Sequence, residues 1–152
     1  MGRLMVREGM EAVSGNDVFA CATYDAQALP LAGKRVLVVD DDPDILGVIS
    51  KILLEFGYDV ISRRNGMEGL ETYRKRPCGL VLTDLDMPGM DGVVLARHIK
   101  SEFPLVPVVL MTGNLLTERE LSPDMGKSFV DEILYKPFRF TELHATLQRL
   151  LP

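Results

Sequence analysis

Five short apolar segments dominate the hydrophobic pattern of this chain from its thirty-sixth residue onward. Each is rich in branched aliphatic residues, and most are separated by stretches in which apolar residues recur every three or four positions. The pattern predicts strands at 36–39, 58–62, 80–83, 106–111 and 133–135, and helices at 43–56, 66–76, 92–100 and 142–151. Strands that alternate with helices indicate an α/β fold whose parallel sheet is covered on both faces.

Capping residues indicate where the predicted helices begin. Asp42 precedes Pro43, a proline suited to the first helical position, and Asn65 precedes the second helix. Thr141 is the expected cap of the last helix, and Gly57 ends the first one.

The first 32 residues differ from the rest of the chain. They mix glycine, serine, asparagine and scattered acids without a sustained period, and Gly9 interrupts a stretch at 3–13 that would otherwise favour a short helix. We expect residues 1–32 to be a partly disordered tail or linker. The remaining residues, 33–152, are enough for one domain with a hydrophobic core and too few for two.

Composition narrows the classes of function. A net charge of −5 argues against direct nucleic-acid binding. Cys21 and Cys78 make neither a disulfide framework nor, without neighbouring histidines, a metal site. No apolar run approaches the ~20 residues of a membrane-spanning helix, and the N-terminus lacks the apolar stretch of a signal peptide. Cytoplasmic localisation without membrane insertion is therefore expected.

Polar and charged residues follow four of the predicted strands. Asp40 and Asp41 come after the first strand, Asp84 after the third, Thr112 after the fourth and Lys136 after the fifth. Ligands of open parallel sheets bind at the carboxyl ends of the strands. We therefore expect these five side chains to converge at one edge of the sheet.

Such a cluster is suited to bind a divalent cation and to accept a phosphoryl group. Two carboxylates ~4 Å apart repel by roughly 4 kcal/mol at an effective dielectric near 20, so three of them need cations nearby. Lys136 supplies one positive charge and Mg²⁺, which prefers carboxylate, water and phosphate oxygens, can supply two more. A carboxylate that attacks a phosphoryl group forms an acyl phosphate. The Thr112 hydroxyl and the Lys136 ammonium are suited to contact its oxygens.

Four segments in this order resemble the receiver domain of two-component response regulators: VLVVDDDPDI, VLTDLDMPGMDG, VVLMTG and YKPF. The resemblance runs from Lys34 to Pro152. It implies a flavodoxin-like (CheY-like), doubly wound five-stranded parallel sheet with strand order 2-1-3-4-5. It also implies phosphorelay signalling, in which a histidine kinase or phosphotransfer protein phosphorylates Asp84 and a conformational change relays the signal.

The resemblance extends to the other site residues. Asp40, Asp41, Asp84 and the backbone carbonyl of Asp86 would hold Mg²⁺, while Thr112 and Lys136 would contact the phosphoryl group. A domain of this kind is not a conventional enzyme, although it catalyses its own Mg²⁺-dependent phosphorylation and dephosphorylation. The kinase, the downstream protein and any dimerisation stay open.

Two features depart from the family. Ile133 stands three residues before Lys136, where the family has an aromatic switch residue, and we expect the nearby Tyr135 to point to a different face. The segment 114–132 replaces an alanine-rich fourth helix, so we expect a short or shifted helix there. We also expect output that does not use the common helix-four surface.

Other interpretations were weighed against the residues. Asp84-x-Asp86 resembles the motif of haloacid-dehalogenase-like phosphohydrolases, but those enzymes place it after the first strand, and no cap domain fits this length. The lead-in LAGKRVLVVDDD resembles receivers of hybrid histidine kinases, so a fragment of such a kinase stays open. We expect His98 and His144 on helix surfaces, and Met87 with Met90 packing the loop after Asp84.

Overall fold

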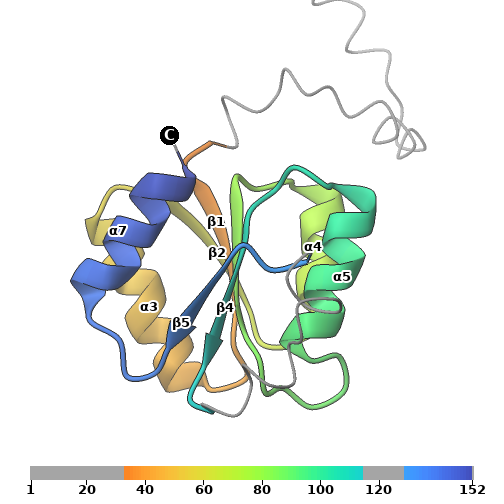
Figure 1. The fold of residues 1–152 in the computed structure, drawn as a ribbon, viewed down its shortest axis with the longest axis horizontal. Helices are drawn as coiled ribbons and strands as arrows, with labels where there is room; N and C mark the ends of the chain where they lie inside the picture. Colours follow the sequence, from red (N-terminus) through yellow and green to blue (C-terminus); the bar gives the residue numbers. More distant parts are fainter. Residues whose placement is uncertain (1–32, 115–128, 152) are drawn as a thin grey trace, which may run out of the picture.

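A five-stranded parallel sheet forms the centre of the computed structural model, which describes residues 33–114 and 129–151 (Figure 1). Its strand order is β2-β1-β3-β4-β5, as expected for a flavodoxin-like fold. The strands are β1 (Arg35–Val39), β2 (Asp59–Arg63), β3 (Leu80–Asp84), β4 (Val108–Thr112) and β5 (Glu132–Tyr135).

Among the described residues, two helices lie on each face of the sheet (Figure 1). Helices α3 and α7 lie on one face, and α4 and α5 lie on the other (Figure 1). Their bounds are α3 (Pro43–Glu55), α4 (Gly66–Lys75), α5 (Gly92–Glu102) and α7 (Phe140–Leu150). None of the helices in the described ranges has the length and apolar character needed to cross a membrane.

The central strands explain the continuous apolar runs in the sequence. Val36 and Val38 pack toward α3 and α7, whereas Leu37 and Val39 pack toward α4 and α5. All four side chains have no solvent exposure. A strand buried on both faces has no polar face to present, so its sequence does not alternate.

Side-chain caps begin three of the helices. The Asp42 carboxylate accepts a hydrogen bond of 2.9 Å from the N–H of Asp44, and the Asn65 side chain accepts one of 2.8 Å from the N–H of Glu68. Both predicted caps are therefore confirmed. Asp91 caps α5 in the same way and was not predicted.

The predicted cap of the last helix is wrong. Helix α7 begins at Phe140 with Arg139 as its N-cap residue, so Thr141 already lies inside the helix. The Glu142 carboxylate accepts a 3.2 Å hydrogen bond from the N–H of Arg139. A glutamate at the third helical position thus satisfies the free N–H of the residue before the helix. The helix can therefore begin at Phe140, two residues before the predicted start.

The fourth strand begins two residues later than predicted, at Val108. The N–H of Val106 donates to the carbonyl of Phe103 in a turn, and Pro107 has no N–H to donate to a ladder. The expectations for residues 1–32 and for the fourth helix between 115 and 128 lie outside the described residues.

The two histidines lie in different environments. His98 is exposed on α5, as expected. His144 is half-buried, because α7 packs beside the C-terminal end of α3. Its ring stacks on Phe56 with centroids 4.1 Å apart and an interplanar angle of 10°, and meets Tyr58 edge-on at 6.2 Å. The expectation of a surface position is therefore wrong for His144.

Gly92 at the start of α5 provides a test of how tightly the loop after β3 is packed. A Cβ at this position would collide with the backbone carbonyl oxygen of Asp84, whereas a Cβ at Gly47 in α3 would meet nothing within 4 Å. We expect Gly92→Ala to lower the free energy of unfolding by about 2 kcal/mol through overpacking. Gly47→Ala should raise it by about 1 kcal/mol through helix propensity. Urea denaturation of both variants measures this, and equal effects would contradict the packing argument.

Candidate functional site: an acidic pocket at the carboxyl edge of the sheet

Lys136 joins two acidic residues that come from different strands. Asp40 follows β1, Asp84 ends β3 and Lys136 follows β5. The Lys136 Nζ atom lies 2.8 Å from Asp84 Oδ1 and 3.2 Å from Asp40 Oδ2. The parallel sheet brings these ends to the same edge, so residues separated by 52 and 96 positions form one hydrogen-bonded group.

A third carboxylate completes an oxygen cluster. Ligand oxygens of Asp40, Asp41 and Asp84 all lie within 4.8 Å of one another. Asp41 is the most exposed of the three, so the cluster opens to solvent on its side. A hard divalent cation takes carboxylate oxygens together with water, and three oxygens at this spacing fit such an ion. The donor set therefore supports divalent metal binding.

Burial and charge oppose each other at Asp84. Burial raises the pKa of the Asp84 carboxyl, the Lys136 ammonium lowers it, and the neighbouring Asp40 and Asp41 charges raise it again; the net direction is upward. Burial lowers the pKa of Lys136, but the carboxylates of Asp84 and Asp40 outweigh that effect and raise it. Lys136 is thus held as a cation, and Asp84 is a carboxylate that would be more stable with further positive charge beside it.

The backbone around β3 fixes the position of Asp84. The N–H of Leu85 donates to the carbonyl of Met111, and the N–H of Gly92 donates to the carbonyl of Leu85 at 2.9 Å. Met87 is buried in the core and Met90 packs against it, which confirms their predicted role in the loop. The turn between them contains Gly89 at φ +80°, a conformation that glycine adopts without strain.

Asp40 is held on both of its carboxylate oxygens. Oδ1 accepts a 2.9 Å hydrogen bond from the N–H of Asp42, and Oδ2 accepts from Lys136. The residue is 1% exposed, and its own N–H donates to the carbonyl of Arg63. Asp42 therefore caps α3 through its side chain and orients Asp40 through its backbone N–H.

Thr112 lies at the same edge of the sheet. Its hydroxyl accepts a 3.0 Å hydrogen bond from the N–H of Asn114, and its carbonyl accepts one of 2.8 Å from the N–H of Lys136. Leu110 packs toward α4 and α5 and Met111 toward α3 and α7, so alternation directs Thr112 toward the α4 and α5 side.

Asp86 contributes no carboxylate to the cluster. Its side chain is exposed, and the acidic group formed by the described residues contains Asp84 with Asp40 and Asp41 instead. A phosphohydrolase that used Asp84 and Asp86 together would need both carboxylates at one site. The arrangement disfavours that alternative.

The expected orientation of Tyr135 is wrong. Ile133 packs against the cluster under α4 and α5, and Leu134 packs into the cluster under α3 and α7. Side chains alternate along a strand, so residues two apart share a face. Tyr135 therefore lies on the same side of the sheet as Ile133.

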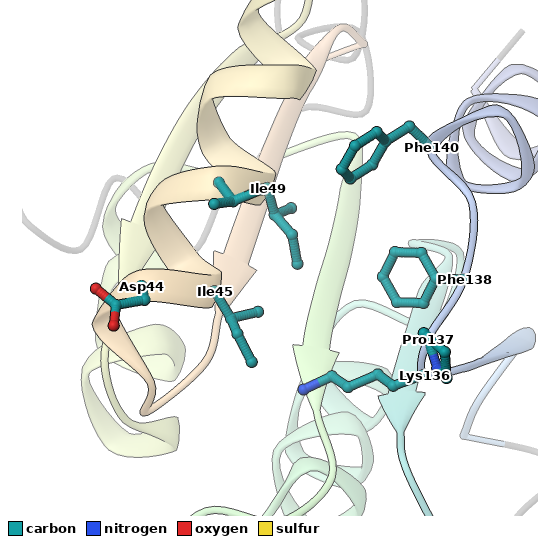
Figure 2. A pocket seen from close by; sticks show the side chains of 8 residues that line it. Asp44, Ile45, Ile49, Lys136, Pro137, Phe138 and Phe140 are labelled. Atoms are coloured by element: carbon teal, nitrogen blue, oxygen red, sulfur yellow. The ribbon is translucent and has the colours of Figure 1, made fainter.

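Sequence reasoning missed an apolar groove beside the acidic pocket. The groove has a volume of about 370 Å³ and lies between the start of α3 and the loop from β5 to α7 (Figure 2). It is lined by Asp44, Ile45, Val48, Ile49, Lys136, Pro137, Phe138 and Phe140. Figure 2 shows the Lys136 side chain extending along its end. The two aromatic residues in Lys136-Pro137-Phe138-Arg139-Phe140 were the available signal.

Comparisons with known proteins identify the family of this fold. The family model of the response regulator receiver domain matches residues 36–148. The chain belongs to this family, whose function is phosphorelay signal transduction.

Curated relatives include both short and long proteins. The response regulator receiver protein CpdR of Brucella abortus is 33% identical over 118 residues, which cover 78% of this chain and 97% of that protein. The DNA-binding transcriptional regulator NtrC of Escherichia coli K12 is 34% identical over 116 residues, covering 76% of this chain and 24% of NtrC. The chain thus spans about a quarter of the length of NtrC and of the transcriptional regulatory protein ZraR of Escherichia coli O157:H7, which it also matches.

Two solved structures share the fold and carry a metal. The receiver domain of the sensor histidine kinase PA1611 from Pseudomonas aeruginosa PAO1 has magnesium coordinated in its active-site cleft. It is 30% identical, with a TM-score of 0.70, and the match covers 79% of this chain and 98% of that one. The response regulator TrrA of Thermotoga maritima, in complex with Mg²⁺-BeF, is 32% identical with a TM-score of 0.70 over 78% and 99% of the chains.

Removing the Asp84 charge tests the electrostatics of the pocket. Because the fold raises the pKa of Asp84, the ionised form destabilises the folded state at neutral pH in the absence of metal. We expect Asp84→Asn to raise the free energy of unfolding by about 1 kcal/mol in EDTA, measured by urea denaturation. Asp86→Asn, which removes an exposed acid outside the cluster, should change it by less than about 0.5 kcal/mol.

Metal should reduce the stability advantage of Asp84→Asn. Millimolar Mg²⁺ is expected to raise the melting temperature of the wild type and of Asp86→Asn, because a ligand that binds the folded state stabilises it. The increase should be smaller for Asp84→Asn. An Asp84→Asn protein less stable than the wild type in EDTA would contradict the electrostatic argument. Lys136 would then compensate the charge of all three carboxylates without metal.

Proposed function

We propose that Asp84 is the phosphoacceptor of this receiver and that Mg²⁺ is the cation of its acidic pocket. The observation that carries the proposal is the placement of Lys136, whose Nζ lies 2.8 Å from Asp84 Oδ1 at the edge of a three-carboxylate cluster. A phosphoryl group on Asp84 would find a cation already within reach. The receiver family and its magnesium-bound members support the same assignment.

The proposed chemistry has two steps, transfer of the phosphoryl group to Asp84 and hydrolysis of the acyl phosphate. A carboxylate oxygen of Asp84 forms a bond to phosphorus while the bond from phosphorus to the donor nitrogen breaks and leaves its electron pair there. Water later attacks the acyl phosphate, releasing inorganic phosphate and restoring the carboxylate. When bound, Mg²⁺ neutralises charge on the phosphoryl oxygens.

The remaining site residues have separate tasks in this proposal. Asp40, Asp41 and Asp84, with the backbone carbonyl of Asp86, would hold the metal. The Lys136 ammonium pairs with a phosphoryl oxygen once Asp84 is modified, and the Thr112 hydroxyl donates to another. The domain thus catalyses its own phosphorylation and dephosphorylation without being a conventional enzyme.

Domain organisation and partners belong to the same proposal. Residues 33–152 are the receiver and residues 1–32 a tail or linker. The donor is a histidine kinase or phosphotransfer protein in the cytoplasm, where ATP supplies such kinases. The relay passes to a downstream protein by conformational change, in a stand-alone receiver or in a piece of a longer regulator or hybrid kinase.

Intact-mass analysis tests the phosphoacceptor. After incubation with Mg²⁺ and acetyl phosphate, the wild type should gain the mass of one phosphoryl group, and Asp84→Asn should gain none. Asp86→Asn, which keeps its backbone carbonyl, should be modified like the wild type. An adduct that survives in Asp84→Asn would move the acceptor elsewhere, and steady phosphate release without an adduct would favour hydrolysis as the activity.

The apolar groove is a suitable docking surface for the protein that donates the phosphoryl group. Val48 and Phe140 line it and are 51% and 48% exposed, although both are large and apolar. Lys136 belongs both to the groove and to the acidic pocket. A partner that buries these side chains would therefore bring its phosphohistidine next to Asp84.

Exchanging one groove residue separates docking from chemistry. With a purified kinase that phosphorylates the wild type, Phe140→Ser should lower the rate of phosphoryl transfer by at least about tenfold. Such a loss is expected when an aromatic residue that the partner buries is removed. Phosphorylation by acetyl phosphate should stay unchanged. Leu54→Ser, at an equally exposed apolar residue of α3 outside the groove, is the matched control and should leave both rates intact. Equal losses in the two variants would exclude the groove as the docking surface.

A further inference from the structure

We propose that a small polar cavity between β2 and α4 binds a compact oxyanion, such as phosphate or a short carboxylate compound. The cavity has a volume of about 190 Å³ and shares no residue with the acidic pocket. Its lining consists of Arg63, Glu68, Glu71, Thr72, Lys75 and Arg76. Pockets for drug-sized ligands are larger, so the occupant of this one is small.

Arg63 is the fixed element of the cavity. Its Nε atom donates to the Thr72 hydroxyl at 2.7 Å, and its Nη1 atom donates to the carbonyl of Ser62 at 2.6 Å. Its backbone is held as well, because its carbonyl accepts a 3.2 Å hydrogen bond from the N–H of Asp40. A guanidinium group held in this way loses little conformational freedom when a ligand binds.

Hydrogen-bond donors remain after the bonds within the protein are made. The Nη2 atom of Arg63 donates to no group in residues 33–114 or 129–151. The Thr72 hydroxyl accepts the bond from Arg63 and keeps its own hydrogen to donate. A guanidinium edge beside a hydroxyl is suited to the oxygens of a phosphate or carboxylate group.

The positive charges of the lining have no counterion in the part of the chain that the structure describes. Arg63, Lys75 and Arg76 take part in none of its ion pairs, whereas Arg74, the neighbour of Lys75 on α4, pairs with Glu102. Arg63 is only partly exposed, so water solvates its charge incompletely. An anion in the cavity would compensate that charge.

The dipole of α4 does not explain this arrangement by itself. Lys75 and Arg76 lie at the C-terminal end of α4, where basic side chains complement the helix dipole. Arg63 comes from β2, however, and its side chain reaches Thr72 within α4. Three cations from two elements therefore line one cavity, and a dipole effect does not require the first of them.

Two glutamates limit the class of ligand. Glu68, Glu71 and Lys75 follow one another at spacings of three and four, so they lie on one side of α4. With three cationic and two acidic side chains, the lining has an excess of one positive charge. A compact oxyanion can contact the cations alone, whereas an extended polyanion would also meet the glutamates. We therefore expect phosphate to bind and a nucleic acid to be repelled.

Heteronuclear NMR of the nitrogen-labelled full chain tests the site. The protein is kept in EDTA, so that anions cannot bind through a divalent cation in the acidic pocket, and sodium phosphate is added at constant ionic strength. Comparison with Arg63→Lys identifies the side-chain Nε signal of Arg63. This signal and the amide signal of Thr72 should shift and then saturate. Malonate, a dicarboxylate probe, should shift the same two signals.

Two variants separate the cavity from general surface charge. Lys75→Gln combined with Arg76→Gln should weaken phosphate binding about tenfold, through the combined loss of two exposed ion pairs. Arg64→Gln removes an exposed charge next to Arg63 but outside the lining, so it should leave the affinity unchanged. Spectra recorded without phosphate show that each variant keeps the fold.

Three results would overturn the proposal. Shifts that grow without saturation, or an equal change of affinity in the double variant and in Arg64→Gln, would mean that phosphate acts only as a general counterion. Saturable shifts confined to the surroundings of Asp84 would place the anion in the acidic pocket. Tighter binding of a short single-stranded DNA at the same signals would replace the compact oxyanion by a polyanion. The phosphorylation of Asp84 is tested separately and does not depend on any of them.

Discussion

The compensation of buried negative charge at one edge of the sheet is the constraint on which the site depends. Three carboxylates converge where Asp84 is 7% and Asp40 only 1% exposed. Their mutual repulsion lowers the stability of the folded state unless cations lie nearby. Lys136 bridges two of them and follows β5, the edge strand, whereas the acids come from the central strands β1 and β3. The site therefore forms only when β1, β3, β4 and β5 are paired in the sheet.

Local contacts at the starts of the helices fix the positions of the acidic residues. Asp42 caps α3 and also donates its N–H to Asp40, so the start of the helix and the geometry of the acid are set by one residue. At β3 the absence of a side chain at Gly92 lets the start of α5 approach the carbonyl of Asp84. The loops that carry the acids are thus held by the elements that follow them.

Much of this arrangement was predictable because it follows from strong local signals. Continuous apolar runs identified the strands of a sheet buried on both faces, and Asp42 and Asn65 identified two helix starts. The strand-end rule then grouped Asp40, Asp84 and Lys136, which the structure joins by hydrogen bonds. Long-range features were harder. The stacking of His144 on Phe56 depends on how α7 packs beside α3, and the groove depends on the loop path between Lys136 and Phe140. The orientation of Tyr135 was predictable from alternation alone and was misjudged.

Lys136 can also be described as a tethered counterion that competes with any dissolved cation for the same carboxylate oxygens. Its local concentration is fixed by the polypeptide and does not vary with the medium. By reciprocal linkage, any event that draws its ammonium away from Asp84 and Asp40 raises the affinity of the pocket for a free cation, and a tightly bound cation loosens Lys136 in return. Metal binding and the pairing of Lys136 with the two carboxylates are therefore coupled.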